Sequence, residues 1–198
     1  MQFLQTKVHH KIYTTYMNLK YNIVVFSILV FTLNSFAQNK STVANKTKST
    51  GINWMSVEEV QEKMKTEPRK VYVDIYTDWC GWCKVMDKKT FTHPNVIKYL
   101  NDNYYCIHYN AERKDSVFFK DKKYGLLPGT KTNELAADWM RNKLSYPTSI
   151  FFEENFNNPQ PVPGYLETPT MEMILKYFGE NKHKTTPWEK YQKEFQQA

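Results

Sequence analysis

Two cysteines that are separated by two residues, Cys80 and Cys83, stand where one predicted element ends and the next begins. Before them, residues 71–76 form a short run of β-branched and aromatic residues, which is typical of a buried strand. After them, residues 81–89 suit a helix. The cysteine pair is therefore predicted to lie at a strand-to-helix junction, and any fold for this chain has to provide one.

Helical and strand periods alternate through the rest of the chain. A first helix is predicted from a capping box of Ser56 and Glu59 up to Pro68. The other expected elements are a helix from Pro94, a strand at 104–109, a hairpin within 117–127, a helix at 133–144 with Leu144 on its apolar face, a strand at 147–152, an edge strand at 161–166 and a helix at 170–178. This order predicts an α/β fold in which helices flank a central mixed sheet.

Residues 1–37 have the pattern of a secretory signal peptide. Residues 23–33 are apolar with two polar interruptions, and Ser35 and Ala37 supply small residues before a cut. Because this stretch is well short of the roughly twenty residues that span a bilayer, we expect no stable membrane span after cleavage. Met17 begins a complete signal of its own and is predicted to be the true start.

The remainder is predicted to contain a spacer, one folded domain and a tail. Residues 38–51 are polar and lack aromatic residues, which indicates a flexible linker. Residues 52–182 are expected to form the domain, and residues 183–198 a C-terminal amphipathic helix. The tail has an aromatic stripe at helical spacing, formed by Trp188, Tyr191 and Phe195. We favour docking of this stripe onto the domain over a partner-binding arm.

The charge balance does not favour nucleic acid as a partner. The chain has 27 Lys and Arg against 20 Asp and Glu, a formal net charge of +7. Three lysines and no acidic residue precede the predicted cut, so 24 basic and 20 acidic residues remain, for a net charge of +4. A small charge spread along the chain is typical of a solvated surface. Glycine-rich phosphate loops are absent, and no cofactor is expected.

Three kinds of chemistry are open to a cysteine pair with this spacing. A zinc site would need two further ligands, and the remaining candidates form no second paired motif: His93, His108, His183 and Cys106. A purely structural bridge would close a loop too small to stabilise the fold much. A redox pair without metal is therefore favoured, and Cys106 is read as a small buried hydrophobic residue.

The position of each cysteine predicts a different role. Cys80 lies at the first turn of the helix, where free backbone N–H groups and the helix dipole stabilise a thiolate. Cys83 lies one turn later and should be more buried. We expect Cys80 to attack a substrate disulfide and Cys83 to resolve the mixed disulfide.

Two motifs carry a family resemblance. Trp79-Cys80-Gly81-Trp82-Cys83-Lys84 after a strand resembles the thioredoxin active site, and Asp74 precedes the first cysteine by six residues, where thioredoxins keep a buried acid. Tyr146-Pro147-Thr148 before a strand is similar to the cis-proline motif of that family. The likeness covers roughly residues 71–178 and extends to thioredoxin-like proteins exported by bacteria.

The resemblance implies a thioredoxin fold with an insert, residues 112–141, before the cis-Pro strand. It implies that Asp74 transfers protons to and from Cys83, although an aspartate that only caps the turn is the alternative. It also implies a substrate groove at five residues: Trp79, Gly81, Trp82, Tyr146 and Pro147. Gly81-Trp82 replaces the Gly-Pro of thioredoxin, which leaves the redox poise open.

These features together predict an exported thiol–disulfide oxidoreductase, periplasmic or secreted. Its expected partners are protein disulfides and, for re-reduction, a membrane electron donor. Whether it acts as reductase, oxidase or isomerase stays open at this point. The alternative is a non-catalytic binding or scaffold protein in which the cysteines are incidental.

Overall fold

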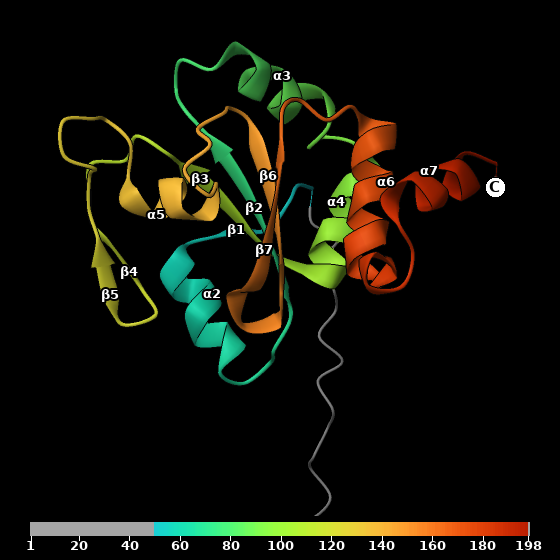
Figure 1. The fold of residues 1–198 in the computed structure, drawn as a ribbon, viewed down its shortest axis with the longest axis horizontal. Coiled ribbons are helices and arrows are strands. Elements are labelled where there is room, and N and C mark those ends of the chain that lie inside the picture. Colours follow the sequence, from blue (N-terminus) through green and yellow to red (C-terminus); the bar gives the residue numbers. More distant parts are fainter. Residues whose placement is uncertain (1–49, 198) are drawn as a thin grey trace, which may run out of the picture. The chain divides into compact units, whose positions relative to one another are not determined.

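The computed structural model describes residues 50–197, which fold around a five-stranded sheet in the order β1-β3-β2-β6-β7 (Figure 1). The strands are β1 (Trp54–Met55), β2 (Lys70–Tyr76), β3 (Tyr104–Asn110), β6 (Thr148–Glu153) and β7 (Asn157–Pro163). β1, β3 and β2 pair in parallel, whereas β6 and β7 are antiparallel to their neighbours. The predicted mixed sheet is confirmed. The signal peptide, the start at Met17 and almost all of the linker lie outside the described residues.

Helices cover both faces of the sheet (Figure 1). The apolar cluster on one face takes residues from α2 (Val57–Met64), α5 (Glu134–Trp139) and the hairpin of β4 (Val117–Phe119) and β5 (Lys122–Tyr124). The cluster on the other face takes residues from α3 (Gly81–Lys89), α4 (Pro94–Asn103) and α6 (Thr168–Gly179). Two 3-10 turns, Glu154–Phe156 and Lys182–Lys184, and α7 (Trp188–Gln197) complete the described chain. Among residues 50–197, no helix combines the length and apolar character needed to cross a bilayer.

The burial of strand β2 on both faces of the sheet explains why its sequence is a continuous apolar run. Val71, Val73 and Ile75 point into the cluster under α2 and α5, whereas Tyr72 points into the cluster under α3. Successive side chains of a strand alternate between its faces, so a central strand is buried on both. Asp74 shares the face of Tyr72, and this face is the one that α3 covers.

The capping box of α2 is confirmed. The Ser56 hydroxyl accepts from the Glu59 N–H at 3.1 Å, and the Ser56 N–H donates to the Glu59 carboxylate at 2.7 Å. The helix ends at Met64, earlier than the predicted limit at Pro68. A proline disfavours helical conformation at the one residue before it, so Pro68 sets an outer limit for the helix and does not explain the earlier end at Met64.

The expected hairpin and the helix after it occur, but both are shorter than predicted. Lys120 and Asp121, with φ of 47° and 63°, form the turn between β4 and β5. The prediction of a helix to residue 144 is wrong, because Arg141 and Asn142 have positive φ and end it. Leu144 is therefore 48% exposed and is not part of an apolar helix face.

The edge strand β7 begins earlier than the predicted 161–166 and ends at Pro163. Its prolines are tolerated because one side of an edge strand needs no ladder hydrogen bonds. Gly164 follows with φ of 98°, a conformation that favours glycine and terminates the strand. Strand β1 was not predicted, since two residues carry no readable period.

The C-terminal segment folds back on α6. The Tyr191 ring of α7 lies 4.9 Å from the Tyr177 ring, and Phe195 lies 5.8 Å from Tyr191. Tyr191 is buried together with Met173 and Tyr177. The described part of the tail is therefore a helix packed on its own domain. The domain boundaries themselves stay predictions.

Candidate active site

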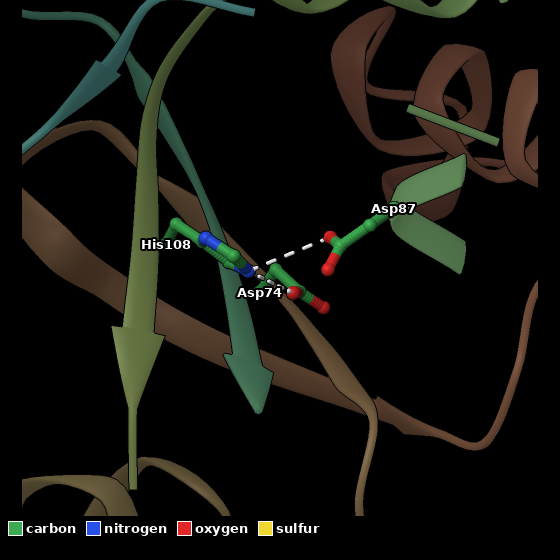
Figure 2. A group of neighbouring side chains, drawn as sticks. All are labelled: Asp74, Asp87 and His108. Carbon is green, nitrogen blue, oxygen red and sulfur yellow. Dashed lines mark ion pairs between the residues drawn. The ribbon is translucent and has the colours of Figure 1, made fainter. Parts of the chain in front are cut away.

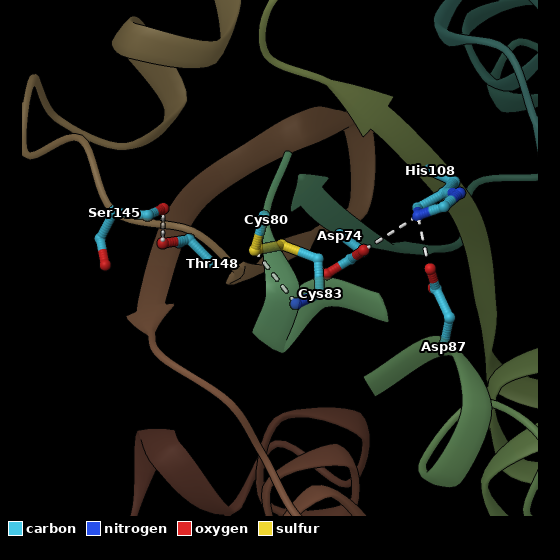
Figure 3. Close-up of a disulfide and its surroundings, with 7 residues drawn as sticks. All are labelled: Asp74, Cys80, Cys83, Asp87, His108, Ser145 and Thr148. Carbon is cyan, nitrogen blue, oxygen red and sulfur yellow. Dashed lines mark hydrogen bonds and ion pairs between the residues drawn. A yellow bond between two sulfur atoms is a disulfide. The ribbon is translucent and has the colours of Figure 1, made fainter. Parts of the chain in front are cut away.

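The cysteine pair lies at the junction between β2 and α3, as Figure 3 shows. After β2 the chain turns at Thr77, whose carbonyl accepts the Cys80 N–H at 3.1 Å. Cys80 then occupies the N-cap position of α3 and Gly81 its first helical position. A Cβ at Gly81 would meet no atom within 4 Å, so packing does not require a glycine there.

Cys80 and Cys83 are joined as a disulfide, with Cα atoms 5.3 Å apart. The Cys83 N–H donates to the Cys80 sulfur at 3.0 Å. Cys80 is 4% exposed and Cys83 2%, so the expected contrast in exposure is small in this oxidised form. The expected difference in thiolate stability between the two cysteines rests instead on the helix N-terminus, because only the Cys80 sulfur lies at the N-cap position.

Two exposed tryptophans flank the disulfide. Trp79 is 64% exposed, and its ring meets the Tyr146 ring edge to face at 5.8 Å. Trp82 is 62% exposed and stacks on Tyr165 at 5.3 Å. The structure thus pairs each predicted tryptophan with a tyrosine. Tyr165 was not predicted, although its place directly after Gly164 in the edge segment was a usable signal.

The proline segment lies beside the start of β6. The Tyr146–Pro147 peptide bond is cis, which confirms the conformation predicted from the family motif. The Gly164 N–H donates to the Pro147 carbonyl at 2.8 Å, and the Thr148 hydroxyl donates to the Ser145 carbonyl at 2.8 Å. Pro147 is buried and Tyr146 is half-buried. The first bond joins the segment to the residue that follows β7, and the second closes a turn within the segment. The part of the segment in substrate binding stays a prediction.

Asp74 is the buried acid beneath the pair. Its side chain is 2% exposed, and its Oδ2 lies 3.1 Å from Nε2 of His108 on β3. The same His108 nitrogen lies 3.7 Å from Oδ1 of Asp87 on α3 (Figure 2). Burial raises the pKa of the Asp74 carboxyl above its usual value of 3.8, and the neighbouring His108 lowers that pKa in part. A carboxyl with a raised pKa is suited to exchange protons near neutral pH.

Neither His108 nor Asp87 was predicted from the sequence to lie beside Asp74; His108 was weighed there only as a zinc ligand. Asp74 and His108 are Cα partners in the parallel register of β2 and β3. In Figure 3 the Asp74 carboxyl group lies between Cys83 and His108. The signal that could have found the pair was an aspartate in the strand predicted to be buried and a histidine in the next predicted strand.

The same three residues are the one group of possible metal ligands in the described part of the chain. Single donor atoms of Asp74, Asp87 and His108 lie within 4.8 Å of one another. An ion there would compete with both ion pairs for the same His108 nitrogen. The histidines considered from the sequence do not converge, since His93 pairs with Glu172 at 3.3 Å and His183 with Glu153 at 3.2 Å.

Cys106 takes no part in the site. It is a free cysteine, 1% exposed, and it packs in the apolar cluster on the α3 side of the sheet. Burial raises the pKa of its thiol far above the ordinary range. This agrees with its reading as a small buried hydrophobic residue.

The chain matches one family model and is similar to two curated proteins. The family Thioredox_DsbH, described as "Protein of unknown function, DUF255", matches residues 33–157. Thiol:disulfide interchange protein DsbD of Escherichia coli K12 is 26% identical over 133 residues, which is 64% of this chain. Mouse spermatogenesis-associated protein 20 is 24% identical over 94 residues, 47% of this chain. The chain spans only 20% and 12% of these two relatives.

Solved structures with a similar fold have low sequence identity. A thioredoxin-fold protein from Helicobacter pylori has a TM-score of 0.48 and 16% identity, and the match covers 72% of this chain and 91% of that one. A DsbH oxidoreductase has a TM-score of 0.47 and 12% identity, over 67% of this chain and 88% of that one.

Proposed function

Since this chain belongs to the Thioredox_DsbH family and has a thioredoxin-like fold, we propose that it is a thiol–disulfide oxidoreductase. It would reduce or exchange disulfides in exported proteins through Cys80 and Cys83. The observation that carries this proposal is the Cys80–Cys83 disulfide at the N-terminus of α3. The similarity to a thiol:disulfide interchange protein suggests the same general activity.

The proposed reduction proceeds in two exchanges. The Cys80 thiolate attacks one sulfur of a substrate disulfide, which forms a mixed disulfide and releases the first substrate thiolate. Cys83 then loses its proton to Asp74 and attacks the Cys80 sulfur. This step closes the Cys80–Cys83 bond, breaks the bond to substrate and releases the second thiolate. Two electrons have moved from the cysteine pair to the substrate, whose thiolates take protons from water or from Asp74.

The substrate would lie along the exposed aromatic rings and the proline segment. Trp79, which contacts Tyr146, and Trp82, which contacts Tyr165, are both exposed and adjoin the two cysteines in the sequence. An extended peptide next to Tyr146 and Pro147 could pair with backbone, as peptides do at sheet edges. Gly81, exposed between the tryptophans, leaves room for it.

Insulin reduction with dithiothreitol tests the activity. We expect the wild-type protein to accelerate precipitation of insulin chains, and Cys80→Ser and Cys83→Ser to abolish or strongly reduce this effect. Cys106→Ser is the matched control, because it removes a thiol outside the pair. Equal rates for wild type and both active-site variants would contradict the proposed oxidoreductase activity. They would favour the alternative, a binding protein that uses the same aromatic surface.

The reduction potential tests the direction. A value near that of thioredoxin, about −270 mV, would support a reductase, whereas about −120 mV would exclude one. A reductase in an oxidising compartment needs a supply of electrons, so we propose a membrane electron donor that reduces the Cys80–Cys83 disulfide.

Export is proposed from residues 1–37. Expression of the full chain in a bacterium, followed by fractionation and N-terminal sequencing, tests it. We expect a periplasmic or secreted product that begins at Gln38. A product that keeps residue 37 and stays in the cytoplasmic fraction would contradict export.

A further inference from the structure

The insert, residues 112–141, is anchored at the edge of the sheet where the cysteine pair lies. The Ala111 N–H, just after β3, donates to the Tyr76 carbonyl at the end of β2 at 2.8 Å, and the Asn133 N–H donates to the Ala111 carbonyl at 2.7 Å. Asn133 is fully buried, and its side-chain oxygen accepts the Tyr109 hydroxyl of β3 at 2.8 Å. Because β2 and β3 are parallel and the cysteine pair follows β2, these bonds fix the insert at the carboxyl ends of both strands.

Thr132 lies directly before this anchor, in a loop whose backbone is closed by hydrogen bonds. Its carbonyl accepts the Leu127 N–H at 2.8 Å, and its own N–H donates to the Thr130 hydroxyl at 3.1 Å. The Thr130 hydroxyl in turn donates to the Leu127 carbonyl at 3.0 Å. Thr132 is 7% exposed, so a fixed backbone carries its side chain inside the protein.

The Thr132 side chain forms a hydrogen bond with Tyr146, the residue before the cis proline. Tyr146 also packs against the apolar cluster to which β4, β5 and α5 of the insert contribute. Its ring meets the exposed ring of Trp79, the residue before Cys80, edge to face at 5.8 Å. Burial raises the pKa of the Tyr146 phenol and the bond with Thr132 lowers it in part, so the phenol is neutral near neutral pH. The insert thus contacts the residue that links the proline segment to the aromatic ring beside the disulfide.

We propose that Thr132 is a positioning residue for substrate binding: its hydrogen bond with Tyr146 lets the insert hold the Tyr146–Trp79 ring pair in the orientation that receives the peptide of a substrate disulfide. The inference rests on the proposed function, since it assigns a role in binding the substrate of that reaction. Within residues 50–197, no hydrogen bond joins Thr132 to either cysteine. Its contribution is therefore to binding, and the exchange of thiols does not depend on it.

Rings that are held in place before the substrate arrives bind it more tightly. Side chains that become immobilised on association lose conformational freedom, and preorganisation avoids that loss. Trp79 is 64% exposed, and the Tyr146 ring is its one ring contact among the described residues. Without the Thr132 bond, Tyr146 would be free to turn and Trp79 would lose a fixed neighbour. Loss of the bond should raise KM and leave kcat nearly unchanged, because binding is weakened equally before and in the transition state.

Substitutions at both ends of the bond measure its contribution. Thr132→Val removes the hydroxyl at nearly constant volume, Thr132→Ser keeps a hydroxyl, and Tyr146→Phe removes the phenol hydroxyl. We expect Thr132→Val and Tyr146→Phe each to raise KM for insulin about fivefold, as for the loss of one hydrogen bond, with kcat nearly unchanged. Thr132→Ser should stay near wild type. Tyr105→Phe is the matched control, because its hydroxyl donates to the Glu67 carbonyl at 3.1 Å at the opposite end of the sheet, and KM should not change.

The double variant Thr132→Val/Tyr146→Phe distinguishes one shared bond from two separate effects. If the bond is shared, KM of the double variant should equal that of either single variant, since the second substitution removes nothing further. KM increases that multiply in the double variant, a Thr132→Ser variant as weak as Thr132→Val, or a fall in kcat with KM unchanged would overturn the inference. An unchanged KM in Tyr146→Phe would also overturn it, and this variant decides the question should Thr132→Val fail to fold.

The indole N–H resonance of Trp79, assigned by its loss in Trp79→Phe, gives a readout that needs no turnover. The Tyr146 ring lies edge to face with the indole, so a change in its orientation shifts this resonance through the ring current. We expect the resonance to move in Thr132→Val and to keep its position in Thr132→Ser and Tyr105→Phe. A resonance that stays in place in Thr132→Val would overturn the inference. Movement as expected in a protein that never reduces insulin would overturn the proposed function and leave the positioning of Tyr146 by Thr132 supported.

Discussion

The two cysteines of the pair differ in what surrounds each sulfur. The Cys80 sulfur accepts the Cys83 N–H at 3.0 Å at the N-terminus of α3, and backbone N–H groups at such a position stabilise negative charge. Cys83 lies beside the buried carboxyl group of Asp74 instead, as Figure 3 shows. The reduced pair should therefore hold its thiolate on Cys80.

The first prediction follows from this difference. We expect brief alkylation of the reduced protein with iodoacetamide at neutral pH to modify Cys80 at least about tenfold faster than Cys83. Peptide mass spectrometry would locate the label. Cys106 serves as the internal control, since burial raises the pKa of its thiol and should leave it unlabelled. Label that first appears on Cys83 would contradict the assigned roles.

Asp74 gives a prediction about pH and stability. Because burial raises its pKa in the folded protein above 3.8, the folded state binds its proton more tightly than the unfolded state. Its contribution is therefore fully present below pH 3.8 and is lost as pH rises through the folded pKa. Each unit of elevation corresponds to about 1.4 kcal/mol.

The measurement compares wild type with Asp74→Asn by urea unfolding at several pH values, with the disulfide intact. The wild-type free energy of unfolding should fall relative to that of Asp74→Asn as pH rises from about 4 toward neutrality. Asp138→Asn, which changes an exposed acid, is the control and should run parallel to wild type. A wild-type advantage that grows with pH would show that the carboxyl group is stabilised as an anion.

At the scale of elements, the start of a helix could be predicted where a capping box or a proline marks it. The capping box at Ser56 placed the start of α2, and Pro94 at the first turn of α4 placed that helix. The end of α5 could not be read, because Arg141 and Asn142 adopt left-handed backbone that their types do not announce. Register was also hidden from the sequence, and register is what places His108 beside Asp74.

The capping box should have a measurable contribution. Ser56→Ala removes the acceptor of the Glu59 N–H and is expected to lower the free energy of unfolding by about 1 kcal/mol. Ser116→Ala, at an exposed position outside the helices, should change it little. Chemical unfolding of both variants checks this. If they lose equal stability, the cap at Ser56 contributes nothing specific.

The Trp82–Tyr165 stack joins α3 to the segment after β7 and is expected to bind substrate. Tyr165→Ala should lower kcat/KM for insulin about tenfold, mainly through KM, because the ring contributes binding rather than chemistry. Phe118→Ala is the control, since Phe118 is 58% exposed on β4 and belongs to the hairpin within the insert. A fall in kcat alone would mean that Tyr165 acts on the exchange and not on binding.

At the scale of the whole molecule, the site gathers segments that the sequence keeps apart. Asp74 and His108 come from two parallel strands, Cys80 from the helix after β2, and Pro147 from the start of β6. The family resemblance anticipated the cysteines, the acid and the cis proline, because each has a local motif. It did not anticipate His108 or Tyr165, because their roles depend on the neighbours that the sheet provides.

The last prediction concerns the tail and its relation to the domain. Tyr191 is 8% exposed and packs with Met173 and Tyr177, so α7 covers an apolar part of α6. Tyr191→Ala should lower the free energy of unfolding by about 3 kcal/mol, comparable to loss of other buried aromatic rings, whereas Lys193→Ala on the exposed face should change it little.

Deletion of residues 187–198 should lower the midpoint of thermal unfolding. Insulin reduction at a temperature where the truncated protein is folded should persist, because none of the described contacts of α7 involves the cysteine pair. An unchanged unfolding midpoint would instead favour a partner-binding arm, and loss of activity in a folded truncated protein would place the tail within the functional machinery.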